Sequence, residues 1–382
     1  MGLIMDPENE AIANRKLQHI EICTRNDVVF PGNCEDVFKE IILVHQAFPG
    51  INLNDVLLST KFLGYELNAP IIIEAMTGGH ESLRTINEQL AKIAKEFKIA
   101  IGLGSQLPLI KSNFKEKILE TYRVVREVSW DIPVIGNIGI TSLWDIDIDK
   151  IKIAMDAIDV DALAVHLNPA QEVIQPEGDT RFGKDLLQRF QVLVKEIRTP
   201  IIIKEVGHGL SMETVKLFYE IGVKMFDTAG ACGTNWALVE AYRNPPDSVK
   251  HIIGAKLSSW GIPTPLSVIE ARVAGPGSVI IASGGIWDGI KAVKSLALGS
   301  NLVGIARPVL KHLLEGGLEN AKKYISLFIE EMRISMFLVG ATTLSELLEK
   351  PLVLGERIIN YMRMRNIDPV LYVKSIRKGR AI

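Results

Sequence analysis

The sequence predicts a (β/α)₈ barrel, and three observations favour this fold. Eight short apolar runs rich in β-branched residues recur along the chain, as in parallel strands that are buried on both faces. Amphipathic segments separate most of these runs, for example residues 84–97, 185–197, 213–222 and 287–298. Chemically rich residues follow almost every run, where a barrel places its active site, and this favours a barrel over an open doubly wound sheet. The expected strands are residues 70–75, 99–103, 133–138, 162–167, 200–204, 224–228, 278–283 and 301–305.

The barrel is expected to occupy residues 61–310. Residues 1–60 precede the first barrel strand and are interpreted as an extension that packs on the barrel. Residues 311–382 are expected to form a helical region, with a basic end at residues 374–380 that is typical of a solvated tail.

The composition is that of an ordinary globular protein. The chain has 382 residues, of which 47% are hydrophobic and 23% charged, with a net charge of -2. This balance gives no reason to expect nucleic acid or an acidic membrane as partner. No apolar run approaches the roughly 18 residues of a membrane span, and the N-terminal residues carry no apolar signal core, so a cytoplasmic location is expected.

The three cysteines, Cys23, Cys34 and Cys232, are odd in number and irregularly spaced. They are interpreted as neither a disulfide framework nor a metal cluster. This interpretation favours a reducing cytosol.

The segment after the fourth expected strand is the most unusual of the chain. His166 and Asn168 are followed by Gln171 and Glu172, so a dense polar cluster comes directly after a buried strand. Such a cluster could bind a phosphate, a metal and a reacting carbon. The alternative is a polar loop with a satisfied histidine, which has no need of so many convergent groups.

A lysine, Lys204, ends the fifth expected strand. Burying its charge is costly without an anionic partner. It could form a Schiff base with a carbonyl substrate or neutralise a bound anion, and the alternative is an ion pair with Glu205 or Glu74.

Small residues follow the last two expected strands and open the next helices. Backbone N–H groups at such helix starts can bind an anion, and barrels often bind phosphate after strands seven and eight. The two segments are 283–286 and 304–308.

With these segments assembled, the sequence resembles the type II isopentenyl diphosphate isomerases, a flavin-dependent family. The resemblance covers nearly the whole chain, and the segment from His166 to Gly178 is its most specific part. The matching segments are 15–19, 48–50, 75–79, 104–106, 166–178, 204–205, 233–236, 260–264, 283–286 and 306–308.

The resemblance implies an enzyme of isoprenoid biosynthesis that converts isopentenyl diphosphate to dimethylallyl diphosphate. It implies FMN, Mg²⁺ and NADPH as the reductant of FMN, and a homo-oligomer, a tetramer or octamer. Gln171 is implied beside the reacting carbons and Glu172 on Mg²⁺. The diphosphate is implied on Arg15, Lys16, His19, Ser105, Gln106, His166 and Asn168, and FMN on Ala75, Met76, Thr77, Ser105, Asn137, Lys204, Thr234, Gly284, Gly285, Ala306 and Arg307.

Two positions depart from the family pattern. Leu107 stands where the family usually has an arginine, and Ala229 stands where a serine is common. A lost charge-assisted hydrogen bond is worth about 1.5–3 kcal/mol, so diphosphate affinity should fall or another cation should compensate.

The chemistry itself points to a cofactor. Isomerisation adds a proton to an unactivated alkene, which a side chain of ordinary pKa cannot drive easily, and the amide of Gln171 is a poor acid. N5 of reduced FMN is therefore the expected acid and base, with Gln171 orienting substrate or relaying a proton.

Three alternatives stay open. An FMN oxidoreductase of the 2-hydroxy-acid-oxidase or dihydroorotate-dehydrogenase kind would need a base, for which His208 is a weak candidate. An enzyme like IMP dehydrogenase would use Cys232 as nucleophile. A flavin- or phosphate-binding module without activity is the third, kept open by the missing arginine.

Overall fold

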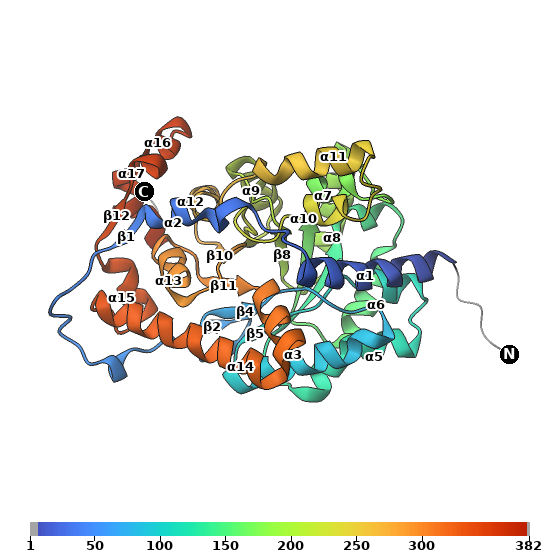
Figure 1. Cartoon of the computed structure of the whole chain (residues 1–382), viewed down its shortest axis with the longest axis horizontal. Coiled ribbons are helices and arrows are strands. Elements are labelled where there is room, and N and C mark those ends of the chain that lie inside the picture. Colours follow the sequence, from blue (N-terminus) through green and yellow to red (C-terminus); the bar gives the residue numbers. More distant parts are fainter. Residues whose placement is uncertain (1–6, 380–382) are drawn as a thin grey trace. The chain divides into compact units, whose positions relative to one another are not determined.

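The computed structural model describes residues 7–379 and contains a closed barrel of eight strands, in the order β10-β11-β4-β5-β6-β7-β8-β9 (Figure 1). Every strand of the barrel coincides with one of the eight apolar runs, which confirms the predicted fold class. The barrel strands are β4 (Ile71–Ile73), β5 (Ala100–Gly102), β6 (Val134–Gly139), β7 (Ala162–Leu167), β8 (Ile201–Glu205), β9 (Met225–Asp227), β10 (Val279–Ser283) and β11 (Leu302–Ile305).

The chain forms two compact units, each built from segments that are distant in the sequence. The first unit comprises Met1–Val28, Ile73–Ile201 and Trp236–Leu257. The second unit comprises Val29–Ile72, Ile202–Asn235 and Ser258–Ile382.

In the first unit, β6 and β7 pair in parallel and bring their polar ends together. Asn137 lies opposite Ala164, and Gly139 lies opposite His166. This register places the polar residues of both strand ends next to each other. The helices of the first unit are α1 (Pro7–Arg25), α3 (Arg84–Phe97), α4 (Leu107–Lys111), α5 (Glu116–Val128), α6 (Ile148–Ile158), α7 (Pro169–Ile174), α8 (Lys184–Glu196), α10 (Trp236–Ala241) and α11 (Val249–Lys256).

In the second unit, the parallel strands β8, β9 and β10 align three polar residues. Lys204 on β8 lies opposite Asp227 on β9, and Asp227 lies opposite Ile281 on β10. Ser283 follows two residues after Ile281, so its side chain is on the same face. The helices of the second unit are α2 (Glu35–Lys39), α9 (Met212–Ile221), α12 (Thr264–Ala274), α13 (Gly289–Ala297), α14 (Arg307–Leu338), α15 (Leu344–Glu349), α16 (Glu356–Met364) and α17 (Pro369–Lys374).

Two short antiparallel sheets lie outside the barrel strands. β1 (Ile41–Leu43) pairs with β12 (Leu352–Leu354), which joins the early and late parts of the second unit, and β2 (Thr60–Phe62) pairs with β3 (Tyr65–Leu67) (Figure 1). The region after residue 310 is mostly helical and also contains β12. A strand of three residues is too short to show a periodic pattern in the sequence.

The longest helix, α14, spans 32 residues and is interrupted at Gly317, whose φ of 72° is not helical. The apolar residues of this helix are mixed with charged ones, as in a helix that packs one side on a protein core. Across residues 7–379, we find no helix with the length and apolar character needed to cross a membrane.

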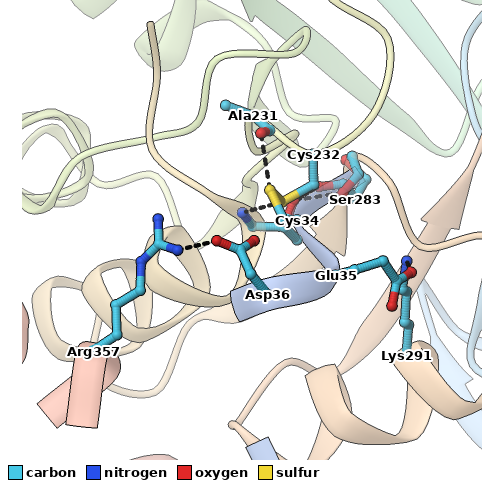
Figure 2. Close-up of a disulfide and its surroundings, with 10 residues drawn as sticks. Cys34, Glu35, Asp36, Ala231, Cys232, Ser283, Lys291 and Arg357 are labelled. Carbon is cyan, nitrogen blue, oxygen red and sulfur yellow. Dashed lines mark hydrogen bonds and ion pairs between the residues drawn. A yellow bond between two sulfur atoms is a disulfide. The ribbon is translucent and has the colours of Figure 1, made fainter. Parts of the chain in front are cut away.

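Cys34 and Cys232 form a disulfide bond in the second unit, with their Cα atoms 5.1 Å apart (Figure 2). The interpretation of the cysteines as unpaired was therefore wrong for these two. They lie 198 residues apart in the sequence, and only the fold brings them together. Cys23 is buried and takes no part in this disulfide.

The disulfide fastens the segment that contains Cys34 beside the loop after β9. Phe30 N–H donates a hydrogen bond to the Gly233 carbonyl oxygen at 2.9 Å in the same place. Two ion pairs extend the attachment, from Glu35 to Lys291 and from Asp36 to Arg357 (Figure 2).

We expect Cys34→Ala to lower the free energy of unfolding by about 2–5 kcal/mol, because the disulfide restricts a long loop of the unfolded chain. Urea unfolding with and without dithiothreitol measures this effect. Cys23→Ala is the matched control and should keep the wild-type sensitivity to dithiothreitol, whereas Cys34→Ala should lose it. Equal unfolding midpoints for the reduced and oxidised wild type would contradict the prediction.

Candidate active site

The polar segment after β7 forms the beginning of α7, with Asn168 as its N-cap residue. Gln171 and Glu172 follow at spacings of three and four, which places all three side chains on one side of the turn. Asn168 Nδ2 donates to Gln171 Oε1 at 3.1 Å and to Glu172 Oε1 at 2.8 Å. The three residues of the predicted cluster therefore form one hydrogen-bonded group.

A carboxylate that the sequence analysis did not single out, Glu240 on α10, lies at the centre of this region. Gln171 Nε2 donates to Glu240 Oε1 at 2.8 Å, and His19 Nε2 lies 2.8 Å from the same oxygen. Arg243 Nη1 donates to the other oxygen at 2.7 Å. Glu240 thus connects the N-terminal helix to the residue expected beside the reacting carbons.

The Glu240 carboxylate is fully buried, with 0% of the residue exposed. Burial alone would raise its pKa, but the hydrogen bond from His19 and the charges of His19 and Arg243 outweigh burial and lower it. The pKa of His19 is lowered, chiefly by burial, although Glu240 opposes this shift. Glu240 is therefore ionised at neutral pH, and Arg243 supplies its positive partner.

The N-terminal helix α1 lies beside α10, although more than 200 residues separate them in the sequence (Figure 1). Arg15 Nη1 lies 3.5 Å from Glu177 Oε1. Lys16 has its pKa lowered to about 8, by burial and by the charge of Arg15. The structure therefore brings Arg15 and His19 to the polar cluster of the same unit, at Glu177 and Glu240.

Three further predicted residues meet at the ends of β5, β6 and β7. The Asn137 Oδ1 atom lies 2.8 Å from His166 Nδ1, and Asn137 N–H donates to Gln106 Oε1 at 3.3 Å. A Cβ atom at Gly139 would lie 3.0 Å from His166 Nε2, so a larger residue at this position would press on the imidazole. Asn137 is predicted as a flavin ligand, and here it also orients a predicted diphosphate ligand.

Gln106 Nε2 and Asn168 Oδ1 are buried polar atoms of the first unit for which residues 7–379 supply no hydrogen-bond partner. A buried polar atom without a partner costs free energy, and binding of a polar ligand would remove this cost. A phosphate oxygen could accept from Gln106 Nε2, and a water or hydroxyl could donate to Asn168 Oδ1. Both residues are among the predicted substrate ligands.

The residues after β4 and β5 are held by their own contacts. Thr77 Oγ1 is hydrogen-bonded to Asn87, and Tyr122 donates from its hydroxyl to the Ser105 carbonyl oxygen at 2.6 Å. Ala75 and Met76 are half-buried. Leu107, in the place of the family's arginine, is half-buried and donates its N–H to Ser105 Oγ at 3.4 Å.

The Glu172 carboxylate is the predicted ligand of Mg²⁺. Besides Asn168, it accepts from the Asp179 N–H at 2.7 Å, and burial raises its pKa. In the described part of the chain, no group of three or more His, Cys, Asp or Glu residues is arranged to hold a metal ion. Any ion here would have one protein carboxylate and take its other ligands from substrate and water, which is how Mg²⁺ is commonly bound.

In the second unit, Lys204 forms a buried ion pair with Asp227. Ser283 Oγ donates to the second oxygen of the same carboxylate. Glu205, one of the partners considered for Lys204, instead accepts from the backbone N–H groups of residues 206–209. Asp227 is thus the anionic partner of Lys204.

The two predicted phosphate segments differ in what they offer an anion. Asp288 caps α13 by accepting from Lys291 N–H at 2.7 Å, and Gly289 N–H donates to Glu331 Oε2 at 2.7 Å. The N–H groups of Gly289 and Lys291 at the start of α13 therefore already have acceptors within the protein. α14 has Ala306 at its N-cap, and no side chain of residues 7–379 caps it.

The glycine pair after β10 has a conformation that other residues rarely adopt. Gly284 and Gly285 have φ values of 93° and 77°. A Cβ atom on Gly284 would lie 2.2 Å from the Gly230 carbonyl oxygen, so two loops of the second unit approach each other closely. Thr234, another predicted FMN residue, is half-buried and forms a β-bridge with Val29.

The barrel matches the structures of other enzymes. The TM-score is 0.61 to a mandelate oxidase mutant with a monooxide FMN adduct, at 14% identity and covering 91% of this chain and 100% of that one. The TM-score is also 0.61 to a flavocytochrome b2 mutant with pyruvate bound, at 20% identity. That match covers 89% of this chain and 83% of the other. A family model of FMN-dependent dehydrogenases matches residues 259–354. The chain thus has the (β/α)₈-barrel fold of these enzymes.

Curated relatives match almost the full chain, and each has the name isopentenyl-diphosphate delta-isomerase. The one from Sulfurisphaera tokodaii is 39% identical over 375 residues, which is 98% of this chain and 100% of the relative. The one from Ignicoccus hospitalis is 41% identical, over 90% of this chain and 94% of the relative. The one from Methanothrix thermoacetophila is 40% identical, covering 94% and 98%. The chain belongs to the isopentenyl-diphosphate delta-isomerase family, as the sequence resemblance predicted.

We expect Glu240→Gln to lower the free energy of unfolding at pH 7 by about 2–4 kcal/mol, because Arg243 loses a buried partner. The pKa of Glu240 is lowered in the folded state, so its contribution is present above 4.5 and is lost as the pH falls through the folded value. Urea unfolding at several pH values measures both effects.

The control for this experiment is Glu177→Gln, because Glu177 also contacts Arg243 but is exposed. This change should lower the free energy of unfolding by less than about 0.5 kcal/mol. Equal losses for the two variants would show that Glu240 has no special role in this network.

Proposed function

We propose that this protein converts isopentenyl diphosphate to dimethylallyl diphosphate. The observation that carries the proposal is the connected group of Gln171, Glu240 and His19 in a chain that matches named isomerases over nearly its full length. The group joins a neutral amide to a buried carboxylate, an arrangement that orients a substrate and adds no strong acid.

The chain's own residues act on substrate position. Glu240 accepts from Gln171 Nε2, and Asn168 Nδ2 donates to Gln171 Oε1, so both ends of the Gln171 amide are held. A fixed amide can hold the isoprenoid carbons in one orientation, and such positioning contributes strongly to rate. Reduced FMN, when bound, supplies the proton donor and acceptor that these residues lack, and NADPH is the proposed reductant.

The diphosphate would be bound by residues of the first unit. Arg15 and Lys16 supply positive charge, and Gln106 Nε2 offers a buried donor that the protein itself does not use. His166 lies near Gln106, because Asn137 contacts both residues. Because Leu107 removes the family's arginine, Arg15 and Lys16 would carry more of the diphosphate charge.

Glu172 would hold Mg²⁺. Its two oxygens accept three hydrogen bonds, from Asn168, Gln175 and Asp179, which fix the carboxylate and leave it able to bind an ion. The ion would neutralise the diphosphate and keep it in register with Gln171.

Residues of the second unit suit FMN chemically. Lys204 is a buried cation at a strand end, and such a charge favours a reduced, anionic ring. The uncapped start of α14, with Arg307 as its first residue, suits a phosphate group. The fit is weaker at α13, whose start is already capped.

The second candidate is an FMN oxidoreductase on the same barrel, which the match of residues 259–354 favours. Its candidate base, His208, is buried, and burial lowers its pKa to about 4, below the range that suits a base at neutral pH. Cys232 lies in a disulfide and offers no thiolate for the mechanism of an IMP-dehydrogenase-like enzyme. Both observations favour the isomerase.

We expect isopentenyl diphosphate to be isomerised when the protein is incubated anaerobically with FMN, Mg²⁺ and NADPH. NADPH should be consumed in far less than stoichiometric amounts, because the reaction has no net redox change. Product is measured by NMR, with FMN or Mg²⁺ omitted in parallel reactions. Consumption of one NADPH for each substrate would instead support the oxidoreductase, and FMN binding without turnover would support an inactive module.

We expect diphosphate affinity to fall roughly fivefold between pH 8 and pH 9, because Lys16 has a pKa of about 8 and loses its charge over this range. Isothermal titration with isopentenyl diphosphate measures the affinity. Lys16→Arg is the matched control, since arginine stays charged and should bind equally at both pH values. A fivefold loss in this variant as well would assign the pH effect to another group.

A further inference from the structure

Asp227 lies between two strands whose ends carry predicted cofactor residues, and its two carboxylate oxygens serve different neighbours. One oxygen faces the Lys204 ammonium, and the other accepts from the Ser283 hydroxyl. The exposed fraction is 8% for Lys204, 2% for Asp227 and 3% for Ser283, so water screens their interactions weakly.

The register of the strands makes this arrangement stiff. Asp227 is the direct partner of Lys204 on β8 and of Ile281 on β10, and Ser283 is two residues further along β10. The three side chains therefore point to the same side of three adjacent strands. The Lys204 ammonium is held where the strand ends place it, and it cannot swing away without leaving a buried carboxylate unpaired.

We propose that Asp227 is a positioning residue that sets how strongly Lys204 favours the reduced cofactor. This inference rests on the proposed binding of FMN next to Lys204. A lone buried ammonium would stabilise the negative charge of reduced FMN strongly. Asp227 holds the ammonium in place and cancels part of its charge, so that the preference for the reduced form is moderated.

The test measures the two-electron reduction potential of bound FMN against a reference dye, with dithionite as reductant and without isopentenyl diphosphate. It is done at pH 6, because a buried lysine without its counter-ion loses its proton more readily. In Asp227→Asn, reduced FMN should bind at least tenfold more tightly relative to oxidised FMN than in the wild type. This corresponds to a shift of about +30 mV for a two-electron couple.

Lys204→Met should shift the potential in the negative direction by a similar amount. Ser283→Ala is the matched control, since it removes a hydrogen bond from the same carboxylate without changing charge, and its ratio of affinities should change less than threefold. An unchanged potential in Asp227→Asn, with FMN bound and the fold intact, would overturn the proposal and leave Asp227 a structural partner only.

The double variant Lys204→Met/Asp227→Asn covers the case in which Asp227→Asn does not fold, since it leaves no unpaired buried charge. Because Asp227 acts through Lys204, the ratio of affinities for reduced and oxidised FMN should be the same in the double variant as in Lys204→Met, within threefold. If this ratio favours reduced FMN at least tenfold more in the double variant than in Lys204→Met, its potential is about 30 mV more positive. That result would mean that Asp227 acts on the cofactor directly. A wild-type protein that binds no FMN would refute the proposed function itself, which is a different outcome from an unmoved potential.

Discussion

The buried carboxylate of Glu240 is the interaction on which the rest of the candidate site depends. It lies on α10, and it is contacted by His19 from α1, by Gln171 from α7 and by Arg243. A buried carboxylate is stable only if an opposite charge balances it and its oxygens accept hydrogen bonds. Loss of any of the three partners would therefore weaken the whole arrangement. The N-terminal helix is therefore joined to the polar cluster of α7 by hydrogen bonds and charge, and its position does not depend on apolar packing alone.

The second unit handles charge in a similar way. Lys204 and Asp227 form an ion pair at the strand ends, and the Glu205 carboxylate accepts hydrogen bonds from backbone N–H groups. Burial nevertheless raises the pKa of Glu205 to about 7. Charged residues at these strand ends are costly, and their presence in pairs or hydrogen-bonded loops is typical of a functional site.

Much of the fold could be predicted from the sequence because parallel strands that are buried on both faces have a strong local pattern. The polar cluster of Asn168, Gln171 and Glu172 was also predictable, since its members are neighbours on one turn. Glu240 was not, because it lies in a short, otherwise apolar helix and two of its partners, Gln171 and His19, lie more than 60 and more than 200 residues away. The disulfide was missed for the same reason, and the capping of α13 by Glu331 depends on a residue 42 positions later.

The disulfide has a consequence for how the chain matures. Ribosomes add roughly 5–20 residues per second, so Cys34 waits roughly 10–40 s for Cys232, which follows 198 residues later. During this time the nearest thiol is Cys23, only 11 positions before Cys34 in the sequence. Cys23 is withdrawn into a cluster with Val28 and Val239, yet Val239 is synthesised after Cys232. Correct pairing thus requires that Cys34 does not pair with the nearer thiol of Cys23 before Cys232 has been synthesised.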